Sequence, residues 1–224
     1  MIGLQIFERK RAVSTDVVKN YLGLPVANVS DSMSRMFAGG SRLRPMHNGT
    51  PMAGPALTVR TRPGDNLFIH KAIAMASPGD VIIVDAGGDL TNALIGEIMA
   101  HMAAVKGLGG FVINGAIRDA KVIKAKDFPV FAAGVTHRGP YKDGPGEINT
   151  TIAIDGMVIQ PGDLIIGDDD GILCVPFDQV ESVYKATLAK SNAEAKMMAD
   201  ISNGIYDSRW VDEALHNIGC KVWD

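Results

Sequence analysis

Cysteine is scarce in this sequence. Cys174 and Cys220 are the two cysteines among 224 residues, and their spacing matches neither a disulfide framework nor a zinc or redox motif. Cys174 lies inside the apolar run 172–175, which predicts a buried and unreactive thiol. The P-loop, nucleophile-elbow, zinc-protease and dinucleotide-binding motifs are also missing, so the sequence gives no support to those enzyme classes.

Long apolar runs and a strong charge of one sign are missing too. Glu97, His101 and Lys106 interrupt the most apolar region, so no segment reaches the length of a membrane span. The N-terminus lacks the pattern of a signal peptide. The net charge is −3, and the basic cluster at 9–11 is short. We therefore expect a cytoplasmic protein that binds neither nucleic acid nor membrane, and in which local arginines or a metal would hold any anionic substrate.

The composition is that of a globular protein, with 46% apolar and 21% charged residues. The length favours one large domain, with or without an arm. We predict an α/β domain over residues 1–176 and a C-terminal helical arm over 177–224. The arm packs either on a neighbouring subunit or back on its own domain. Near the N-terminus, residues 15–37 are expected to form two helices, the second entered through Ser30 or Asp31.

The middle of the chain predicts a parallel β-α-β unit. Residues 81–84 read as a buried strand, 93–105 as a helix and 111–113 as the next strand. After residue 134, short apolar runs separated by turn residues favour an antiparallel or mixed β layer. Pro-Gly-Asp occurs at 78–80 and again at 161–163, each time before an apolar strand, which is common turn chemistry.

The most informative stretch is 107–119, GLGGFVINGAIRD. A glycine-rich turn leads into an apolar strand that ends at Arg118 and Asp119, and ligands of open α/β sheets bind outside such strand ends. Asp119 could hold a hard cation with water, and Arg118 could bind ligand oxygens. The early N–H groups of the helix predicted from Ala93 could hold a carboxylate or phosphate. A solvated ion pair at the start of the next helix is the alternative, and the pattern alone leaves both open.

Four further groups of polar residues are weaker candidates. Asp85 and Asp89 are better explained as turn formers or helix caps. The contiguous aspartates 168–170 do not match a calcium loop, and a turn is the stronger interpretation. His70 falls on a predicted helix and is more often a packed histidine than a ligand. The loop around 137–142 could be a lid or a subunit contact.

Residues 54–176 resemble the family that joins the regulator of ribonuclease E activity to the class II pyruvate aldolases. The order and spacing of the matching segments make the resemblance specific. These segments are GPALTVRTRPGDNLFIHKA, PGDVIIVDA, GEIMA, GGFVINGAIRDA, PVFAAG and PGDLIIGDDDGILCVP. The C-terminal segment YDSRWVDEALHNIGC is similar to that of the 4-hydroxy-4-methyl-2-oxoglutarate / 4-carboxy-4-hydroxy-2-oxoadipate aldolases.

The resemblance implies a fold and an assembly. The fold would be an α/β/β/α sandwich with a swivelling-domain-like β layer, assembled as a homotrimer or homohexamer with sites at subunit contacts. Some members supply a further acid from a neighbouring subunit's arm. In this chain Glu194 and Asp200 are the candidates for that acid.

The resemblance also implies roles for individual residues. Asp119 would anchor Mg²⁺ or Mn²⁺, largely through water, and Arg118 would contact substrate oxygens. Glu97 would lie close to the metal's water molecules. The implied catalytic residues are Arg118, Glu97 and Asp119; the implied substrate-binding residues are Gly96, Glu97, Ile98, Met99 and Arg118.

The implied activity is a metal-dependent lyase reaction on small 2-oxo acids. Retro-aldol cleavage of 4-hydroxy-4-methyl-2-oxoglutarate or 4-carboxy-4-hydroxy-2-oxoadipate would give pyruvate and a second 2-oxo acid, as in aromatic compound catabolism. Oxaloacetate decarboxylation would be a side activity. A bound cation would stabilise the enolate, with Arg118 adding charge and Glu97 tuning proton transfer. The alternative is a non-catalytic RraA-like regulator that binds a protein such as a ribonuclease.

Overall fold

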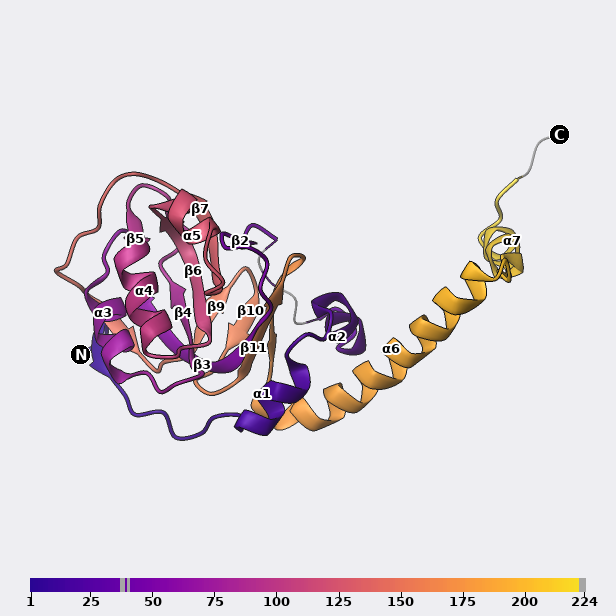
Figure 1. The fold of residues 1–224 in the computed structure, drawn as a ribbon, viewed down its shortest axis with the longest axis horizontal. Helices are drawn as coiled ribbons and strands as arrows, with labels where there is room; N and C mark the ends of the chain where they lie inside the picture. Colours follow the sequence, from indigo (N-terminus) through magenta and orange to yellow (C-terminus); the bar gives the residue numbers. More distant parts are fainter. Residues whose placement is uncertain (37–38, 40, 222–224) are drawn as a thin grey trace. The chain divides into compact units, whose positions relative to one another are not determined.

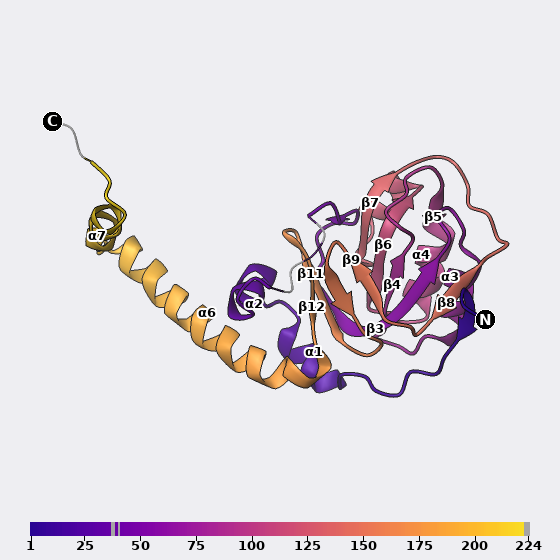
Figure 2. The same cartoon turned by 180° about the vertical axis from the view of Figure 1, so that it is seen from behind.

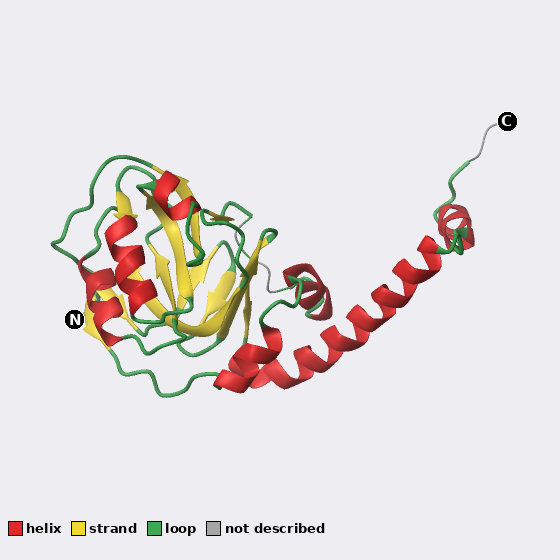
Figure 3. Ribbon diagram, in the orientation of Figure 1, coloured by secondary structure: helices red, strands yellow, loops and turns green. Residues whose placement is uncertain are grey.

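The computed structural model describes residues 1–36, 39 and 41–221. The chain divides into two compact units, Met1–Thr187 and Leu188–Asp224. The first unit is a mixed α/β domain built around a large sheet (Figures 1 and 3). Its strands are β1 (Leu4–Ile6), β2 (Arg44–Pro45), β3 (Met52–Thr61), β4 (Val81–Asp85), β5 (Ala93–Ile95), β6 (Gly110–Ile117), β7 (Val130–Val135), β8 (Gly146–Ile148), β9 (Ile152–Ile154), β10 (Met157–Ile159), β11 (Leu164–Asp168) and β12 (Gly171–Val175).

The helices connect and cover these strands. They are α1 (Thr15–Tyr21), α2 (Val26–Ser32), α3 (Leu67–Met75), α4 (Glu97–Val105), α5 (Ala120–Lys124), the 3-10 turn η1 (Phe177–Gln179), α6 (Val180–Ser202) and α7 (Arg209–Asn217). Strands β3, β4, β6 and β7 are parallel neighbours. The crossovers between them carry α3, α4 and α5 in turn. The predicted parallel β-α-β unit is therefore confirmed, and it is one of three.

Three hydrophobic cores separate four layers of structure. The first core lies between the parallel strands and α3 and α4, which cover one face of the sheet in Figure 1. The second lies between the other face of those strands and a β layer of β9–β12. The third lies between β11 and β12 and the helices α1, α2 and the start of α6, as the rear view in Figure 2 shows for α1 and α2. The layers are thus α, β, β and α, as the resemblance implied.

The period of two along the strands explains why both faces of the sheet are buried. In β4, Val81 and Ile83 enter the second core, whereas Ile82 and Val84 enter the first. Successive side chains of a strand point to opposite faces, so an uninterrupted apolar run suits a strand that is covered on both sides. The mixed β layer predicted after residue 134 is also present, because β11 runs antiparallel to both β12 and β3.

The two Pro-Gly-Asp segments form equivalent turns. Asp80 accepts the N–H of Ser77 at 2.8 Å, and Asp163 accepts the N–H of Gln160 at 2.9 Å. Each buried carboxylate also pairs with an arginine of the short basic cluster, Arg9 with Asp80 at 2.8 Å and Arg11 with Asp163 at 3.6 Å. The cluster at 9–11 therefore ties the N-terminal segment to these two turns.

Two predicted helix starts are wrong. Helix α2 begins at Val26, after Pro25, so Ser30 and Asp31 lie inside it. The first N–H of α2 is capped by a residue far away in the sequence, because Val26 N–H donates to Asp168 Oδ2 at 2.9 Å. Residue 37, at the end of the segment predicted as two helices, lies outside the described residues.

The second wrong start affects the candidate site. The helix expected from residue 93 begins at Glu97, and Ala93–Ile95 forms β5 instead. This strand pairs in parallel with the end of β6, and all three of its side chains are buried. Burial of Ala93–Ile95 against β6 therefore outweighs the helical spacing of the apolar residues in this segment. As a result, the first turn of α4 lies beside the end of β6.

The unit Leu188–Asp224 contains the greater part of α6 and all of α7. Several of its apolar side chains are exposed: Met197, Met198, Ile201, Ile205, Tyr206, Trp210, Leu215 and Ile218. Glu194 pairs with Lys190 at 3.1 Å on α6. In the described part of the chain, no helix is long and apolar enough to cross a membrane.

Candidate active site

The end of β6 delivers Arg118 and Asp119 to the start of α4. The N–H of Glu97 donates to Asp119 Oδ2 at 3.0 Å, and the N–H of Arg118 donates to the carbonyl of Ile95 at 3.0 Å. Arg118 Nε lies 3.7 Å from Asp119 Oδ2. Strand β6 and helix α4 are therefore joined at the two residues that the sequence singled out.

Asp119 adopts a left-handed backbone conformation, with φ of 57°. This region is sparsely populated by residues other than glycine, although aspartate is among those found there. Such conformations cost about 1–3 kcal/mol and persist where the surroundings enforce them. Here the conformation turns the chain from β6 into α5 while the carboxylate reaches back to α4.

Gly96 makes this approach possible. A Cβ at this position would overlap Asp119 Oδ2 and would lie 2.8 Å from Cγ of Arg118. Its φ of −150° is open to any residue, so the requirement for glycine is one of space and not of backbone conformation. The glycine thus brings the backbone of α4 into direct contact with both charged side chains.

The first turn of α4 leaves backbone donors free for a ligand. The first N–H groups of a helix have no intrahelical acceptor. Glu97 gives its N–H to Asp119, and Ala100 donates to the carbonyl of Gly96, which leaves the N–H groups of Ile98 and Met99. Both residues line a pocket of about 300 Å³, called the substrate pocket below. Its lining residues are Asn66, His70, Leu94, Ile95, Gly96, Ile98, Met99, Arg118, Gly139, Pro140 and Lys142.

The charged side chains that line the substrate pocket are cationic. Arg118 comes from the end of β6, and Lys142 comes from the loop before β8. Burial lowers the pKa of His70, and the nearby charge of Lys142 lowers it further. His70 is therefore a neutral imidazole near pH 7, able to donate or accept a hydrogen bond. Two cations and the free N–H groups of α4 make the pocket suitable for an anion.

The donor set fits a hard divalent cation and does not fit a zinc site. Asp119 uses Oδ2 for the N–H of Glu97, while Oδ1 accepts no hydrogen bond from the described residues. Magnesium needs one or two protein carboxylates and keeps most of its water. Asp119 can provide one carboxylate, and because its side chain is half-exposed, the bound water has room. Among the described residues, no group of three or more histidine, cysteine, aspartate or glutamate side chains could hold a metal ion, as a closed zinc site would require.

Glu97 lies at a different pocket from its neighbours Ile98 and Met99. It lines a groove of about 290 Å³ between α4 and α5, together with His101, Lys126 and Asp127 among other residues. Glu97 is absent from the lining of the substrate pocket. The first turn of α4 is thus flanked by the two pockets, with Asp119 hydrogen-bonded at its start.

The structure supports the turn interpretation for the other aspartates. Asp85 Oδ1 accepts the N–H of Gly87 at 3.1 Å, and Asp89 accepts the N–H of Thr91 at 2.9 Å. Asp168 accepts the N–H of Asp170 at 2.9 Å and caps α2. Cys174 is buried as predicted, and burial raises the pKa of its thiol above the ordinary value, with the charge of Asp163 adding to the effect.

Three polar residues of the pocket, Asn66, His70 and Lys142, have no role in the prediction from sequence. Lys142 lies in a glycine- and proline-rich loop, and Asn66 precedes α3 as its N-cap residue. His70 lies on α3, where the sequence indicates no partner for it. Pairing across the fold brings them together, because the N–H of Asn66 donates to the carbonyl of Tyr141 at 3.0 Å. No local motif in the sequence carries this information.

Comparison with known proteins identifies the family of this chain. A model of the RraA-like family, described as Aldolase/RraA, matches residues 26–174. The chain therefore belongs to the RraA-like family, as its sequence motifs indicated.

The relatives include an enzyme by name and a regulator. The chain is 38% identical over 202 residues to the "Putative 4-hydroxy-4-methyl-2-oxoglutarate aldolase" of Halalkalibacterium halodurans, covering 90% of this chain and 96% of that protein. An uncharacterised protein from Pseudomonas syringae has a similar structure, with a TM-score of 0.78 and 28% identity over 88% of this chain and 93% of that one. The structure of the RNA-processing inhibitor RraA from Thermus thermophilis is also similar, with a TM-score of 0.62. The two sequences are 28% identical, and the match covers 68% of this chain and 92% of that one.

Proposed function

We propose that this chain is a divalent-metal-dependent aldolase that cleaves 4-hydroxy-2-oxo acids to pyruvate and a second 2-oxo acid, with oxaloacetate decarboxylation as a side activity. The observation that carries the proposal is the Asp119–Glu97 hydrogen bond with Arg118 alongside it. This arrangement puts a guanidinium and free backbone donors at the substrate pocket. The carboxylate proposed to bind the cation lies at the start of α4 next to them, although Asp119 is not among the residues that line the pocket. The 38% identity to the named aldolase supports the same class of substrate.

Substrate binding follows from the donors that face the substrate pocket. The free N–H groups of Ile98 and Met99 hold the carboxylate of the 2-oxo acid, as helix N-termini hold anions. Arg118 forms a planar fork to substrate oxygens. Gly96 keeps the helix start close enough for both contacts.

The chemistry needs negative charge to be stabilised as the carbon–carbon bond breaks. A divalent cation at Asp119, Mg²⁺ or Mn²⁺, would supply Lewis-acid polarisation of the 2-oxo acid. The Arg118 guanidinium stabilises the oxyanion of the pyruvate enolate. The same stabilisation serves decarboxylation of oxaloacetate, whose loss of carbon dioxide leaves the same enolate. No lysine Schiff base is required.

Proton transfer is assigned to Glu97. Its backbone is fixed by Asp119, and its exposed side chain begins beside the site. A carboxylate there can move a proton through water between the substrate hydroxyl and the methyl carbon of pyruvate. The side chain lines the groove between α4 and α5, so this role requires it to act through water or to change rotamer.

Assembly remains part of the proposal. The exposed apolar side chains of α6 and α7 suit a contact with another copy of the chain, in a trimer or hexamer. Glu194 and Asp200 are the residues from which such a copy would contribute an acid. The proposed arm over 177–224 includes all the residues of the unit Leu188–Asp224.

The rival proposal is a non-catalytic regulator that binds a protein partner. The fold likeness to the RNA-processing inhibitor RraA favours it. The aldolase proposal requires a 2-oxo acid to bind in the presence of Mg²⁺, whereas the regulator proposal does not. Titration calorimetry measures this binding directly.

Pyruvate release tests the aldolase proposal. Purified protein is assayed with oxaloacetate and with 4-hydroxy-4-methyl-2-oxoglutarate, with Mg²⁺ or with EDTA. We expect turnover that EDTA abolishes and that Mg²⁺ or Mn²⁺ restores. Turnover that EDTA does not affect, or no turnover with either substrate, would contradict the proposal.

A further inference from the structure

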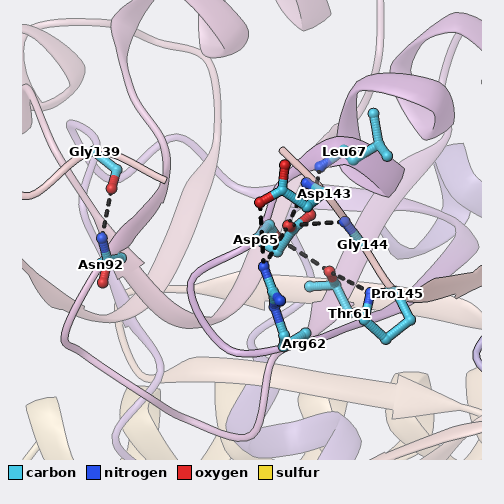
Figure 4. Close-up of polar contacts among 9 residues, drawn as sticks. All are labelled: Thr61, Arg62, Asp65, Leu67, Asn92, Gly139, Asp143, Gly144 and Pro145. Carbon is cyan, nitrogen blue, oxygen red and sulfur yellow. Dashed lines mark hydrogen bonds and ion pairs between the residues drawn. The ribbon is translucent and has the colours of Figure 1, made fainter. Parts of the chain in front are cut away.

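One side of the substrate pocket is formed by a loop, residues 139–145, called the pocket wall below. Gly139, Pro140 and Lys142 line the pocket. For the overlapping loop 137–142, the sequence suggested either a lid or a subunit contact. The structure shows it attached to the domain at both ends (Figure 4).

The attachment near Lys142 is made by a buried carboxylate, Asp65, whose exposed fraction is 0%. Asp65 Oδ2 accepts the N–H of Asp143 at 2.7 Å and the N–H of Gly144 at 2.9 Å. On the other side of Lys142, the N–H of Tyr141 donates to the carbonyl of Gly64 at 2.8 Å. The backbone of Lys142 is therefore held by a hydrogen bond at each neighbouring residue.

The same carboxylate also holds the start of α3. Asp65 Oδ1 accepts the N–H of Leu67 at 3.0 Å, and Arg62 Nη2 lies 3.1 Å from Oδ2. Helix α3 carries His70, and Asn66 precedes it; both line the pocket. Asp65 thus joins the two segments that supply Asn66, His70 and Lys142. A buried charge is stabilised only when its hydrogen bonds are satisfied. Here the pocket wall supplies two of the four donors, the start of α3 supplies one, and Arg62 is the fourth.

The far end of the pocket wall has a second, exposed attachment. The Nδ2 of Asn92 donates to the carbonyl of Gly139 at 2.5 Å, as Figure 4 shows. A Cβ on Gly139 would lie 3.4 Å from Nη1 of Arg118, so this end of the wall is next to the arginine of the site. The wall is held by Asn92 beside Arg118 and by Asp65 beside Lys142.

We infer that Asp65 is a positioning residue, which with Asn92 holds the pocket wall in place so that the substrate pocket is preformed. Asp65 touches no substrate and acts through the backbone on either side of Lys142. Preformed pockets bind more tightly because less ordering is needed on binding. This inference rests on the proposed function where it is tested by enzyme kinetics, but not where it is tested by amide hydrogen exchange.

The chain offers a matched control in Asp163. It is also buried, at 2% exposed, and accepts the N–H groups of Gln160 at 2.9 Å and Phe177 at 3.0 Å. An arginine lies near it, Arg11 at 3.6 Å. Asp163 precedes β11 and is absent from the lining of the substrate pocket. Asp65→Asn and Asp163→Asn therefore remove the same kind of buried charge, one beside the pocket and one away from it.

The experiment compares these two variants and Asn92→Ala with the wild type. KM and kcat are measured for oxaloacetate with Mg²⁺, and amide hydrogen exchange is followed over residues 139–145. We expect KM to rise about tenfold in Asp65→Asn and about threefold in Asn92→Ala, with kcat changed less than KM. Asp163→Asn should keep the wild-type KM. Exchange at Asp143 and Gly144 should quicken in Asp65→Asn alone.

Each outcome decides the inference. Equal KM changes in Asp65→Asn and Asp163→Asn, or unchanged exchange at Asp143 and Gly144, would overturn it. If Asp65→Asn does not fold, Asn92→Ala decides, and an unaltered KM there overturns the inference. If the wild type turns over no 2-oxo acid, the proposed function fails, while the exchange data still decide whether Asp65 holds the pocket wall.

Discussion

Asp119 Oδ2 accepts the backbone N–H of Glu97 at 3.0 Å. The two residues are 22 positions apart, and their contact joins the end of β6 to the first turn of α4. The same carboxylate is the proposed metal ligand. The contact leaves Oδ1 for a cation and the N–H groups of Ile98 and Met99 for the substrate.

Gly96→Ala should damage the site more than the fold. A Cβ at Gly96 would overlap Asp119 Oδ2, so the carboxylate and Arg118 must move. Displacement of about 1 Å in a catalytic group can cost about 100-fold in rate. We expect kcat/KM to fall by about this factor while the melting temperature, followed by circular dichroism, changes little. A variant with wild-type kcat/KM would show that the close approach has no catalytic role.

Asp119→Asn should abolish metal binding and leave the fold intact. Asparagine also tolerates the left-handed conformation, and its carbonyl can still accept the N–H of Glu97. Calorimetric titration with Mn²⁺ should show binding in the wild type and none in the variant. Asp89→Asn is the control, because it changes a turn carboxylate that accepts the N–H of Thr91; it should bind Mn²⁺ as the wild type does. Equal Mn²⁺ affinity in both variants would remove Asp119 from the metal site.

Arg118→Lys should not restore function, because lysine cannot make the planar fork to carboxylate oxygens. Loss of one stabilising group at an oxyanion typically costs about 100- to 1,000-fold in kcat, and we expect a decrease in this range. Arg42→Ala serves as the control, since Arg42 pairs with Asp155 at 2.8 Å at the surface. If both variants turn over oxaloacetate at the same rate as the wild type, the guanidinium has no role in the chemistry.

His70 should titrate below the ordinary histidine range. Burial is the larger cause of its lowered pKa, and the charge of Lys142 the smaller. Lys142→Gln should therefore raise the pKa of His70 part of the way towards about 6.5, as nuclear magnetic resonance titration would measure. No change in the variant would place Lys142 away from His70.

The same shift has a consequence for stability. The folded protein binds the His70 proton more weakly than the unfolded chain, so stability falls as the pH drops through about 6.5. His70→Gln should remove this component of the pH dependence, measured as the melting temperature between about pH 8 and pH 5. Parallel curves for wild type and variant would contradict the lowered pKa.

Some of the site could be predicted from local sequence. Arg118 and Asp119 stand out because they end a buried parallel strand, and the position of such an end in an α/β sheet is well determined. The helix start at Glu97 was missed, because Ala93–Ile95 has apolar side chains compatible with either a helix or a short buried strand. Pairing with β6 decides between them, and pairing is a property of the whole fold.

The role of Asp65 could not be predicted in the same way. Its carboxylate binds the N–H groups of Asp143 and Gly144, 78 and 79 residues away. In the sequence it stands in a Pro-Gly-Asp-Asn turn, where an aspartate has an adequate local explanation. Lys142 stands in the loop around 137–142, where no helix or strand indicates from the sequence which way a side chain points.

Exchange of the methyl protons of pyruvate with deuterium oxide tests the central claim most directly. Formation of the enolate in the site must exchange these protons, whichever longer substrate is the natural one. We predict exchange by the wild type with Mg²⁺, detected by proton nuclear magnetic resonance, and its loss with EDTA, in Asp119→Asn and in Arg118→Lys. Exchange that persists in Asp119→Asn, or that never occurs in the wild type with Mg²⁺, would contradict the account.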